Sequence, residues 1–262
     1  MVKATSASGT KVAVEMRDLN LVYMSKNRQV PALKDVNLSV EEGSFVCLLG
    51  PSGCGKTSLL RLIAGFRKPT SGLITLDGEP ITGPDRQRGV VFQQPTLYPW
   101  LTVQKNVEFG LKMRKLPREE RREIARRCID TVGLQEFTQT YPYELSGGMK
   151  QRVAIARVLA NDPRLVLMDE PFGALDAMTK EQMQQWVRGI WKTMHKTVVF
   201  VTHDIDEALM LGTKVVVMTN RPGRVSKVLN PSFTIQADAN NADEVKGLPE
   251  FAEMRREIHL SM

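Results

Sequence analysis

The stretch FVCLLGPSGCGKT, residues 45–57, decides the fold. Its first part, FVCLL, is a short continuous apolar run, which is typical of a buried parallel strand. The residues from Lys56 to Ala64 then show helical periodicity. Between them, GPSGCGKT (Gly50 to Thr57) matches the pattern G-x-x-x-x-G-K-[ST], in the strand-loop-helix context that a phosphate-binding loop requires. The sequence therefore predicts a binding site for a nucleoside triphosphate.

The residue types in this loop predict how it binds phosphate. Glycines let the backbone curl so that successive N–H groups point at phosphate oxygens. Lys56 supplies a positive charge to the outer phosphates, and the hydroxyl of Thr57 can bind Mg²⁺. The alternative, a glycine-rich turn that happens to precede Lys-Thr, is disfavoured by the flanking strand and helix. The residues expected at the nucleotide are Gly50, Pro51, Ser52, Gly53, Cys54, Gly55, Lys56, Thr57 and Ser58.

A second apolar run, LVLM at residues 165–168, ends in the carboxylates Asp169 and Glu170. The carboxyl end of a buried parallel strand is where α/β sheets bind their ligands. Asp169 is placed to hold the Mg²⁺ ion, and Glu170 to orient or deprotonate a water molecule against the terminal phosphate. Together with the phosphate-binding loop, this pair predicts hydrolysis of the bound nucleotide.

Composition limits the class of protein. The chain has 262 residues, of which 42% are hydrophobic and 25% charged, as in an ordinary soluble globular protein. No apolar run approaches the ~20 residues that span a bilayer, and the polar N-terminus lacks a secretory signal, so we expect a cytosolic chain with a short disordered N-terminal tail. The three cysteines have no metal-ligand spacing, and nothing favours a disulfide.

The net charge of +7 is compatible with nucleic acid or an anionic membrane surface as a partner. The basic residues are spread out, however. The densest cluster, residues 118–127, interleaves five arginines with three glutamates, which is typical of a solvated helix face.

The order of the predicted elements indicates an α/β fold. Strands are predicted at residues 12–21, 33–40, 45–49, 73–76 and 90–92, with a hairpin turn at Asp77-Gly78. Apolar residues recur at helical spacing between Val103 and Ala160, where Pro117 opens one helix and Gly133 closes it. Strands return at 165–168, 197–201 and 215–218, each followed by a helix, and this alternation predicts a parallel sheet with helices on its faces.

The stretch LSGGMKQR, Leu145 to Arg152, predicts a second anion site. A serine can cap the helix and two glycines expose its first amides, and exposed amides at a helix N-terminus attract anions. This stretch lies in the helical insertion. If it cannot fold back onto the phosphate-binding loop of its own chain, it must reach that of a second copy. A head-to-tail dimer would then enclose two nucleotides.

The motifs GPSGCGKT, LSGGMKQR and LVLMDEP, in this order, resemble those of the nucleotide-binding subunit of an ATP-binding cassette (ABC) transporter, over roughly Val14 to Arg224. The resemblance implies ATP and Mg²⁺ as cofactors. It also implies one P-loop NTPase domain: a RecA-like mixed-sheet core at about 12–95 and 162–225 with an antiparallel β subdomain, an α-helical subdomain at about 96–161, and a C-terminal tail at 226–262.

The same resemblance assigns roles outside the loop. It implies that Tyr23 stacks on adenine, that Gln93 contacts the Mg²⁺ ion or the attacking water, and that His203 contacts the terminal phosphate. It places Asp176 in a loop that crosses the dimer interface. The residues implied to bind the nucleotide of the second copy are Ser146, Gly147 and Gly148. Met149 stands where a glutamine is commoner, which leaves the serine and both glycines in place.

The partners also follow from the resemblance. The segment PTLYPWL, residues 95–101, carries Leu97, Tyr98 and Trp100, which are either ordinary core or the border of a groove. In the resembled family this region, Gln93 to Leu101 here, receives a short coupling helix of the transmembrane permease. The chain is then expected to lie peripherally on the cytoplasmic face of the membrane, and to serve an extracytoplasmic substrate-binding protein only indirectly.

Three peripheral segments resemble the nitrate/sulfonate/taurine import group. They are MTNRPGRV (218–225), PWLTVQKNVEFGL (99–111) and LPEFAEMRREI (248–258). The resemblance implies the ATPase of a bacterial importer for a small anion, whose substrate other subunits bind.

Two rival functions remain to be weighed. An ABC-type ATPase that acts on nucleic acid or ribosomes usually has a long coiled coil or two cassettes in one chain, and this sequence has neither. A P-loop kinase or GTPase would leave LSGGM, Asp176 and His203 unexplained, and the sequence has no Asn-Lys-x-Asp stretch of the kind that recognises guanine. We therefore expect no nucleic-acid partner.

Overall fold

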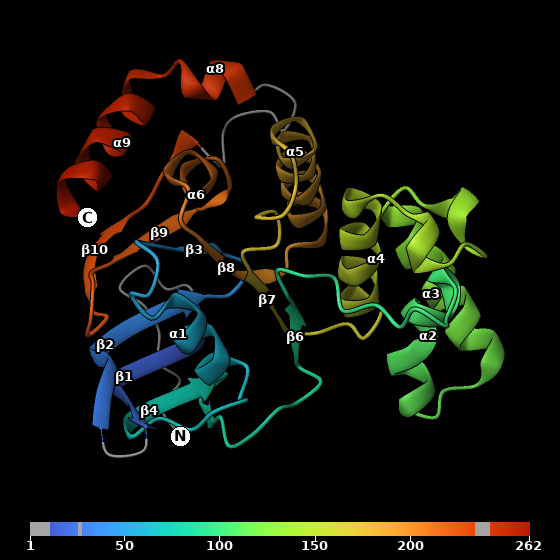
Figure 1. The fold of residues 1–262 in the computed structure, drawn as a ribbon, viewed down its shortest axis with the longest axis horizontal. Helices are drawn as coiled ribbons and strands as arrows, with labels where there is room; N and C mark the ends of the chain where they lie inside the picture. The colour runs from blue at the N-terminus through green and yellow to red at the C-terminus, as the bar shows by residue number, and fades with distance from the viewer. Residues whose placement is uncertain (1–10, 26–27, 234–241) are drawn as a thin grey trace. The chain divides into compact units, whose positions relative to one another are not determined.

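The structure, a computed structural model, describes residues 11–25, 28–233 and 242–262. The chain forms two compact units (Figure 1): the first comprises residues 1–85 and 184–262, and the second residues 86–183. The predicted N-terminal tail and residues 234–241 of the polar segment before Lys246 lie outside the described residues.

An antiparallel sheet in the first unit has the strand order β2-β1-β4-β5. In the last part of β2, Val36, Leu38 and Val40 are buried and the residues between them are not, so this strand turns one face to the core. The predicted turn Asp77-Gly78 joins β4 to β5, and both of its residues have positive φ, as a tight hairpin turn requires. The strand bounds are β1 Val12–Ser25, β2 Arg28–Glu41, β4 Ser71–Leu76 and β5 Glu79–Pro80.

The other strands of the first unit form a mixed sheet. β3 pairs in parallel with both β8 and β9, and β10 is antiparallel to β9. Every residue of β3 and β8 is buried, which explains why β3 is apolar throughout and β8 is apolar between its terminal threonines. The bounds are β3 Phe45–Leu49, β8 Thr197–Thr202, β9 Lys214–Met218 and β10 Val225–Leu229, and the helices are α1 Lys56–Ile63, α6 Ile205–Leu211, α8 Ala242–Lys246 and α9 Pro249–Ser261.

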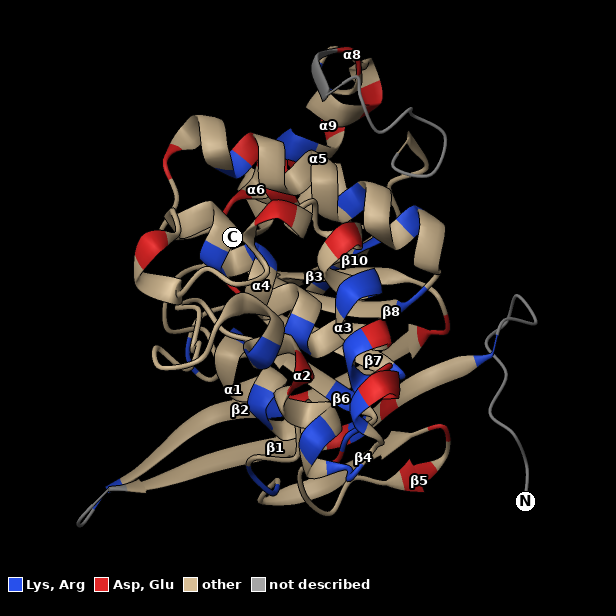
Figure 2. Ribbon diagram, turned by 90° about the vertical axis from the view of Figure 1, so that its right-hand side faces the viewer, with Lys and Arg blue, Asp and Glu red and all other residues tan. Residues whose placement is uncertain are grey.

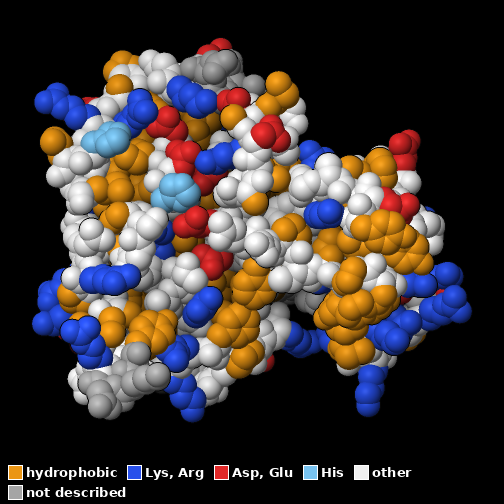
Figure 3. Space-filling model, in the orientation of Figure 1, with side chains coloured by type: hydrophobic (Ala, Val, Ile, Leu, Met, Phe, Trp, Pro, Cys, Tyr) orange, Lys and Arg blue, Asp and Glu red, His pale blue; other side chains and the backbone are white. Residues whose placement is uncertain are grey.

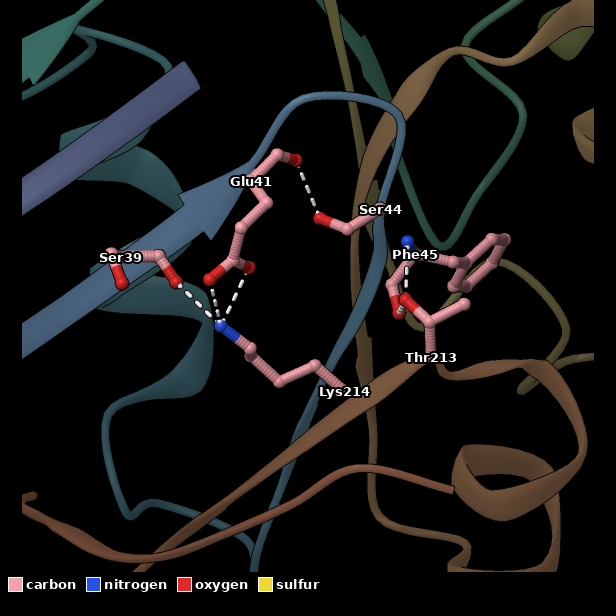
Figure 4. A network of polar contacts seen from close by, with 6 residues as sticks. All are labelled: Ser39, Glu41, Ser44, Phe45, Thr213 and Lys214. Atoms are coloured by element: carbon pink, nitrogen blue, oxygen red, sulfur yellow. Dashed lines mark hydrogen bonds and ion pairs between the residues drawn. The ribbon is translucent and has the colours of Figure 1, made fainter. Parts of the chain in front are cut away.

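A polar network ties the two sheets of the first unit together (Figure 4). The ammonium of Lys214, at the start of β9, lies 2.6 and 2.7 Å from the carboxylate oxygens of Glu41, at the end of β2. It also donates to the carbonyl oxygen of Ser39 at 3.2 Å. One residue earlier, the hydroxyl of Thr213 accepts a 3.0 Å hydrogen bond from the backbone N–H of Phe45. The network therefore holds the start of β3, the strand that carries the phosphate-binding loop.

The second unit is mainly helical. Strands β6 (Arg88–Val91) and β7 (Leu165–Asp169) are parallel neighbours, and the helices lie between them in the chain. Helix α3 buries Ala125 and Ile129, while its arginines and glutamates share the outer surface (Figure 2), where Arg126 and Glu123 form an ion pair of 2.9 Å. The predicted solvated helix face is confirmed. The helices are α2 Val103–Met113, α3 Arg118–Thr131 and α4 Gly147–Leu159, with the 3₁₀ turns η1 Gln135–Phe137 and η2 Pro142–Glu144.

Helix α5 (Ala177–Met194) begins in the second unit and ends in the first. No helix among the described residues combines the length and the apolar character needed to cross a membrane. All three cysteines are free thiols, as expected, and burial raises the pKa of the Cys47 thiol well above its usual value, so that Cys47 behaves as a small buried hydrophobe.

The predicted strands are present, although several differ at their ends. One prediction is wrong: the strand at 215–218 is followed by the antiparallel strand β10, which was not predicted, and not by a helix. β1 and β2 form a longer hairpin than the apolar pattern predicts, because backbone pairing continues to Ser25 and Arg28 beyond the last buried residues. Pro117 immediately precedes α3, and Gly133, with φ of 67°, follows its end, as predicted.

Candidate active site

The predicted phosphate-binding loop joins β3 to α1 in the first unit. Gly53 and Gly55 have φ of 81° and 101°, in the left-handed region that favours glycine. Space is restricted too, since a Cβ at Gly55 would lie 2.7 Å from Leu33 Cδ2. Because Gly55 is also the N-cap residue of α1, it turns the chain into a helix whose first amides carry the positive end of the helix dipole.

Lys56 is held by the loop to which it belongs. Its side chain is almost completely buried (4% exposed), and its ammonium donates to the carbonyl oxygens of Gly50 at 2.7 Å and Pro51 at 3.0 Å. Burial of a charged ammonium is tolerated only with such partners. The next two residues, Thr57 and Ser58, belong to the first turn of α1. This arrangement fits the phosphates of a nucleotide, because exposed amides, a fixed positive charge and a hydroxyl converge on one loop.

Tyr23, on β1, lies beside this helix. Its hydroxyl is 3.0 Å from the hydroxyl of Ser58, and the guanidinium carbon of Arg67 lies 4.3 Å from the centre of its ring. The hydrogen bond fixes the phenol ring next to the phosphate-binding loop. An aromatic ring in this place can offer a face to a nucleotide base.

His203 follows β8 directly. Because β8 pairs in parallel with β3, and Thr202 is opposite Leu49, His203 and Gly50 leave neighbouring strands at the same level. The Thr202 hydroxyl accepts from the backbone N–H of Asp204 at 3.0 Å and contacts the buried carboxylate of Glu207, and these bonds shape the turn in which His203 is exposed. The carboxyl edge of this sheet therefore brings the loop and the histidine together.

In the second unit, Asp169 ends β7 and Glu170 follows with φ of 45°, a strained value for a non-glycine residue. Gln93 follows the neighbouring strand β6. Both side chains border Gly173, where a Cβ would lie 3.3 Å from Gln93 Nε2 and 3.8 Å from Glu170 Oε2. The amide and the carboxylate therefore lie in the same part of the second unit, as their positions after adjacent parallel strands would lead us to expect.

Ser146 caps helix α4, since its hydroxyl accepts a 3.2 Å hydrogen bond from the backbone N–H of Met149. Gly148 is packed against the start of α5, where a Cβ would lie 2.9 Å from Thr179 Cγ2. Asp176 in turn accepts a 3.0 Å hydrogen bond from the Thr179 backbone. Two segments to which the sequence assigned separate roles therefore share one contact at Thr179.

The structure thus gathers the predicted residues into two groups. The first unit holds the loop from Gly50 to Ser58 with Tyr23 and His203. The second unit holds Gln93 with Glu170 and, at the start of α4, Ser146 to Gly148 with Asp176. No individual role was predicted for Asn106 or for Arg221. A signal existed for Asn106, because an asparagine beside Val103 and Val107 on an apolar helix face needs buried polar partners.

Asn106 organises the segment 98–102 from inside the second unit. It is fully buried, accepts from the backbone N–H of Tyr98 at 2.8 Å, and donates to the carbonyl oxygens of Tyr98, Leu101 and Thr102 at 2.9–3.1 Å. The Tyr98 ring packs on Phe109 with 4.3 Å between ring centres. Arg157 supports the chain just before this segment by donating to the Thr96 carbonyl at 2.6 Å.

Trp100 is 71% exposed in this rigid segment, so it is not a core residue. It borders a cavity of about 450 Å³ whose wall contains apolar and basic side chains. Figure 3 shows hydrophobic side chains gathered on the visible face of the second unit, with Lys and Arg side chains beside them. The cavity is lined by Trp100, Leu101, Thr102, Gln104, Lys105, Glu108, Phe109, Lys112, Arg118, Arg121, Arg122 and Gln139.

A glycine-rich loop between a buried parallel strand and a helix, with a buried lysine, defines a P-loop nucleotide-binding protein. Comparison with known proteins narrows this class. The family model described as ABC transporter matches residues 33–173. Two similar relatives are the nitrate import ATP-binding protein NrtD of Synechocystis (48% identical, covering 94% of this chain and 93% of the relative) and the taurine import ATP-binding protein TauB of Pelagibacter ubique (49%, 92% and 92%).

Solved structures agree with the sequence relatives. The dimeric ATP-binding cassette MJ0796 bound to ADP and Pi superposes with a TM-score of 0.73 at 37% identity, covering 83% of this chain and 98% of that one. The ABC transporter component CbiO1 of Clostridium perfringens superposes with a TM-score of 0.77 at 29% identity, covering 95% and 98%. The chain belongs to the ABC transporter family and is an ATP-binding subunit with ATPase activity. The predicted fold class is confirmed.

Proposed function

We propose that this chain hydrolyses ATP at the cytoplasmic face of a membrane to power a bacterial importer of a small anion such as taurine, another sulfonate or nitrate. The supporting observation is similarity at 48–49% identity, over more than nine-tenths of the chain, to proteins named for taurine and nitrate import. Similarity of that extent favours a transport ATPase over an ATPase that acts on nucleic acid.

The experiment is reconstitution. The chain is placed in liposomes with ATP and the permease that co-purifies with it, and uptake of taurine and of nitrate is measured when the corresponding binding protein is present. We expect ATP-dependent uptake of one of these anions and none with Lys56→Ala. ATP hydrolysis without uptake of any small sulfonate or inorganic anion would contradict the import function while leaving the ATPase in place.

The predicted site residues have different roles in the proposed hydrolysis. Lys56 and the loop amides bind the phosphates, and Thr57, Asp169 and Gln93 would hold Mg²⁺, which neutralises phosphate charge when it is bound. Hydroxyl, carboxylate and amide oxygens are ligands that suit this ion. Glu170 polarises the attacking water, Gln93 beside it orients that water, and His203 donates a hydrogen bond to the terminal phosphate.

The Ser146 segment acts on the nucleotide of a second copy. Two glycines begin α4 without side chains. Gly148 is buried, but Ser146 and Gly147 are exposed, and this exposed end of the helix is where a phosphate would bind. A head-to-tail dimer satisfies this requirement twice. Glu170→Gln, which slows hydrolysis, should accumulate an ATP-dependent dimer in size-exclusion chromatography, and adding Ser146→Arg should abolish it. A monomer under all these conditions would contradict the arrangement.

We also propose that the cavity beside Trp100 receives the coupling helix of the permease. The segment is rigid, because Asn106 holds it, and an exposed tryptophan provides an apolar anchor of the kind found at binding hot spots. Five of the lining residues are Lys or Arg and one is Glu, so the helix that fits should carry acidic side chains beside its apolar face.

Trp100→Ala tests this docking surface. We expect the variant to hydrolyse ATP alone at the wild-type rate, and to lose co-purification with the permease and substrate-stimulated hydrolysis. Met113→Ala, which removes another exposed apolar side chain of the same unit outside the cavity wall, is the matched control. Full coupling in Trp100→Ala would exclude this surface.

A further inference from the structure

The segment MTNRPGR, residues 218–224, packs on the phosphate-binding loop. This segment connects β9 to β10. A Cβ at Gly223 would overlap the carbonyl oxygen of Cys54, and a Cβ at Gly50 would lie 2.6 Å from the carbonyl oxygen of Met218. Gly223 is bonded on its other side to β2, because its N–H donates to the Ala32 carbonyl at 2.9 Å. The segment is therefore built to lie against the loop at close range.

Within this segment, Arg221 extends over Gly53. Its Nη2 is 3.2 Å from the position that a Gly53 Cβ would occupy, and its Nε lies 3.4 Å from the Gly53 carbonyl oxygen. That long contact is its one polar interaction in the part of the chain that the structure describes, and the side chain is exposed. A guanidinium has five N–H donors, so Arg221 lies beside the loop with most of its donors available to a ligand.

The neighbouring arginine of the segment is different. Arg224 forms an ion pair of 3.7 Å with Asp35, so its charge is already compensated within the chain. Arg221 has no carboxylate partner among the described residues, although it is next to the loop that binds a strongly negative ligand. Guanidinium is the cation best suited to phosphate, because its planar fork can bind two oxygens at once.

We propose that Arg221 is a further phosphate-binding residue of the nucleotide site, a second cation that reaches the phosphates from the Gly53 side while Lys56 is held within the loop. The proposal rests on the nucleotide site proposed above. Gly223 has no side chain and so allows the segment that carries Arg221 to approach the loop. Because the contact is with phosphates that stay bound, Arg221 strengthens nucleotide binding and contributes little to the chemical step.

The test is nucleotide affinity measured by titration calorimetry on the full chain, in EDTA so that no hydrolysis occurs. We expect Arg221→Gln to weaken ATP and ADP binding about tenfold, to change AMP binding much less, and to lose most of this difference at high salt because the interaction is between charges. Arg221→Lys should recover part of the affinity. Arg224→Gln, the matched control, should bind like the wild type.

The melting temperature without nucleotide separates phosphate binding from support of the loop. The proposal requires that Arg221→Gln melt like the wild type while its ATP affinity falls. Unchanged ATP affinity overturns it, and so does an equal loss for ATP, ADP and AMP together with a lower melting temperature. A wild-type chain that does not bind ATP would instead refute the nucleotide site itself, so the two failures are distinguishable.

Discussion

The carboxylate of Asp176 accepts a 3.0 Å hydrogen bond from the backbone N–H of Thr179, and the methyl group of Thr179 packs against Gly148. The start of α5 is therefore in contact with the helix that carries Ser146. Two segments predicted to act at a dimer interface cannot change conformation independently. The strength of the Asp176 cap should influence both.

The cap predicts a pH dependence at Thr179. The backbone N–H of Thr179, first among several hydrogen bonds, lowers the pKa of Asp176 below its usual value. A carboxylate with a depressed folded-state pKa stabilises the helix above the unfolded pKa of about 4, and this stabilisation is lost as the pH falls through the folded value. The hydrogen-exchange protection factor of the Thr179 amide should fall over that acidic range. In Asp176→Asn, which keeps an acceptor without a charge, it should not; an unchanged wild-type profile would refute the cap.

Lys214→Met should lower the free energy of unfolding by about 1–3 kcal/mol, because it leaves the Glu41 carboxylate partly buried without its ammonium partner. The side chains of Lys214 and Glu41 are 15% and 21% exposed. Urea unfolding measures the change. Lys11→Met breaks ion pairs with a side chain that is 50% exposed and should cost less than about 1 kcal/mol. Equal losses in both variants would show that burial of the pair does not matter.

Asn106→Leu should destabilise the protein clearly, although the two side chains are similar in size. It removes the protein partner of the Tyr98 N–H and of the Leu101 carbonyl, whereas the carbonyls of Tyr98 and Thr102 keep backbone N–H donors. An unsatisfied buried group costs about 1–3 kcal/mol when water cannot reach it. We expect the unfolding midpoint in urea to fall and the fluorescence anisotropy of Trp100 to decrease, since the segment 98–102 loses its support. The wild-type anisotropy in a folded Asn106→Leu variant would contradict this role.

Glu170→Gln should reduce the turnover number for ATP by at least about 10²-fold, the usual contribution of a general base. ATP affinity should stay within about twofold, because the change keeps the shape of the side chain and removes only its ability to accept a proton. Single-turnover kinetics with direct nucleotide titration separates the two quantities. Glu136→Gln, at an exposed position of the 3₁₀ turn η1, is a control that should change neither. Normal turnover in Glu170→Gln would assign the base elsewhere.

Gly55→Ala should weaken ATP binding more than it lowers stability. A side chain at Gly55 would clash with Leu33, and an L-amino acid at this position would have to adopt a φ of 101°. Strain of this kind costs about 1–3 kcal/mol and falls on the turn that aims the first amides of α1 at phosphate. Gly78→Ala also has a positive φ but open space around it, so it should reduce stability alone. Nucleotide titration and thermal unfolding of both variants check this expectation.

The local pattern of the sequence was enough to predict the strand, loop and helix around Lys56, because consecutive residues supply the whole motif and backbone conformation is set locally. It was also enough to place Asp169 and Glu170 at the end of a buried strand. That Gln93 and Glu170 both border Gly173 follows less directly, since it depends on which strands are neighbours.

Only the tertiary structure decided the rest. The sequence around Trp100 is compatible with a core position or with the border of a groove. Trp100 is exposed because of the way in which Asn106 holds the segment, and no local sequence pattern indicates that arrangement. Arg221 lies 168 residues from Gly53 in the chain, and the two meet because β9 pairs with β3. By itself the sequence determined the phosphate-binding motif and the order of strands and helices as far as β9, because these depend on residues close together in the chain. Contacts between distant segments depend on strand order and close packing, and these exist only in the folded chain.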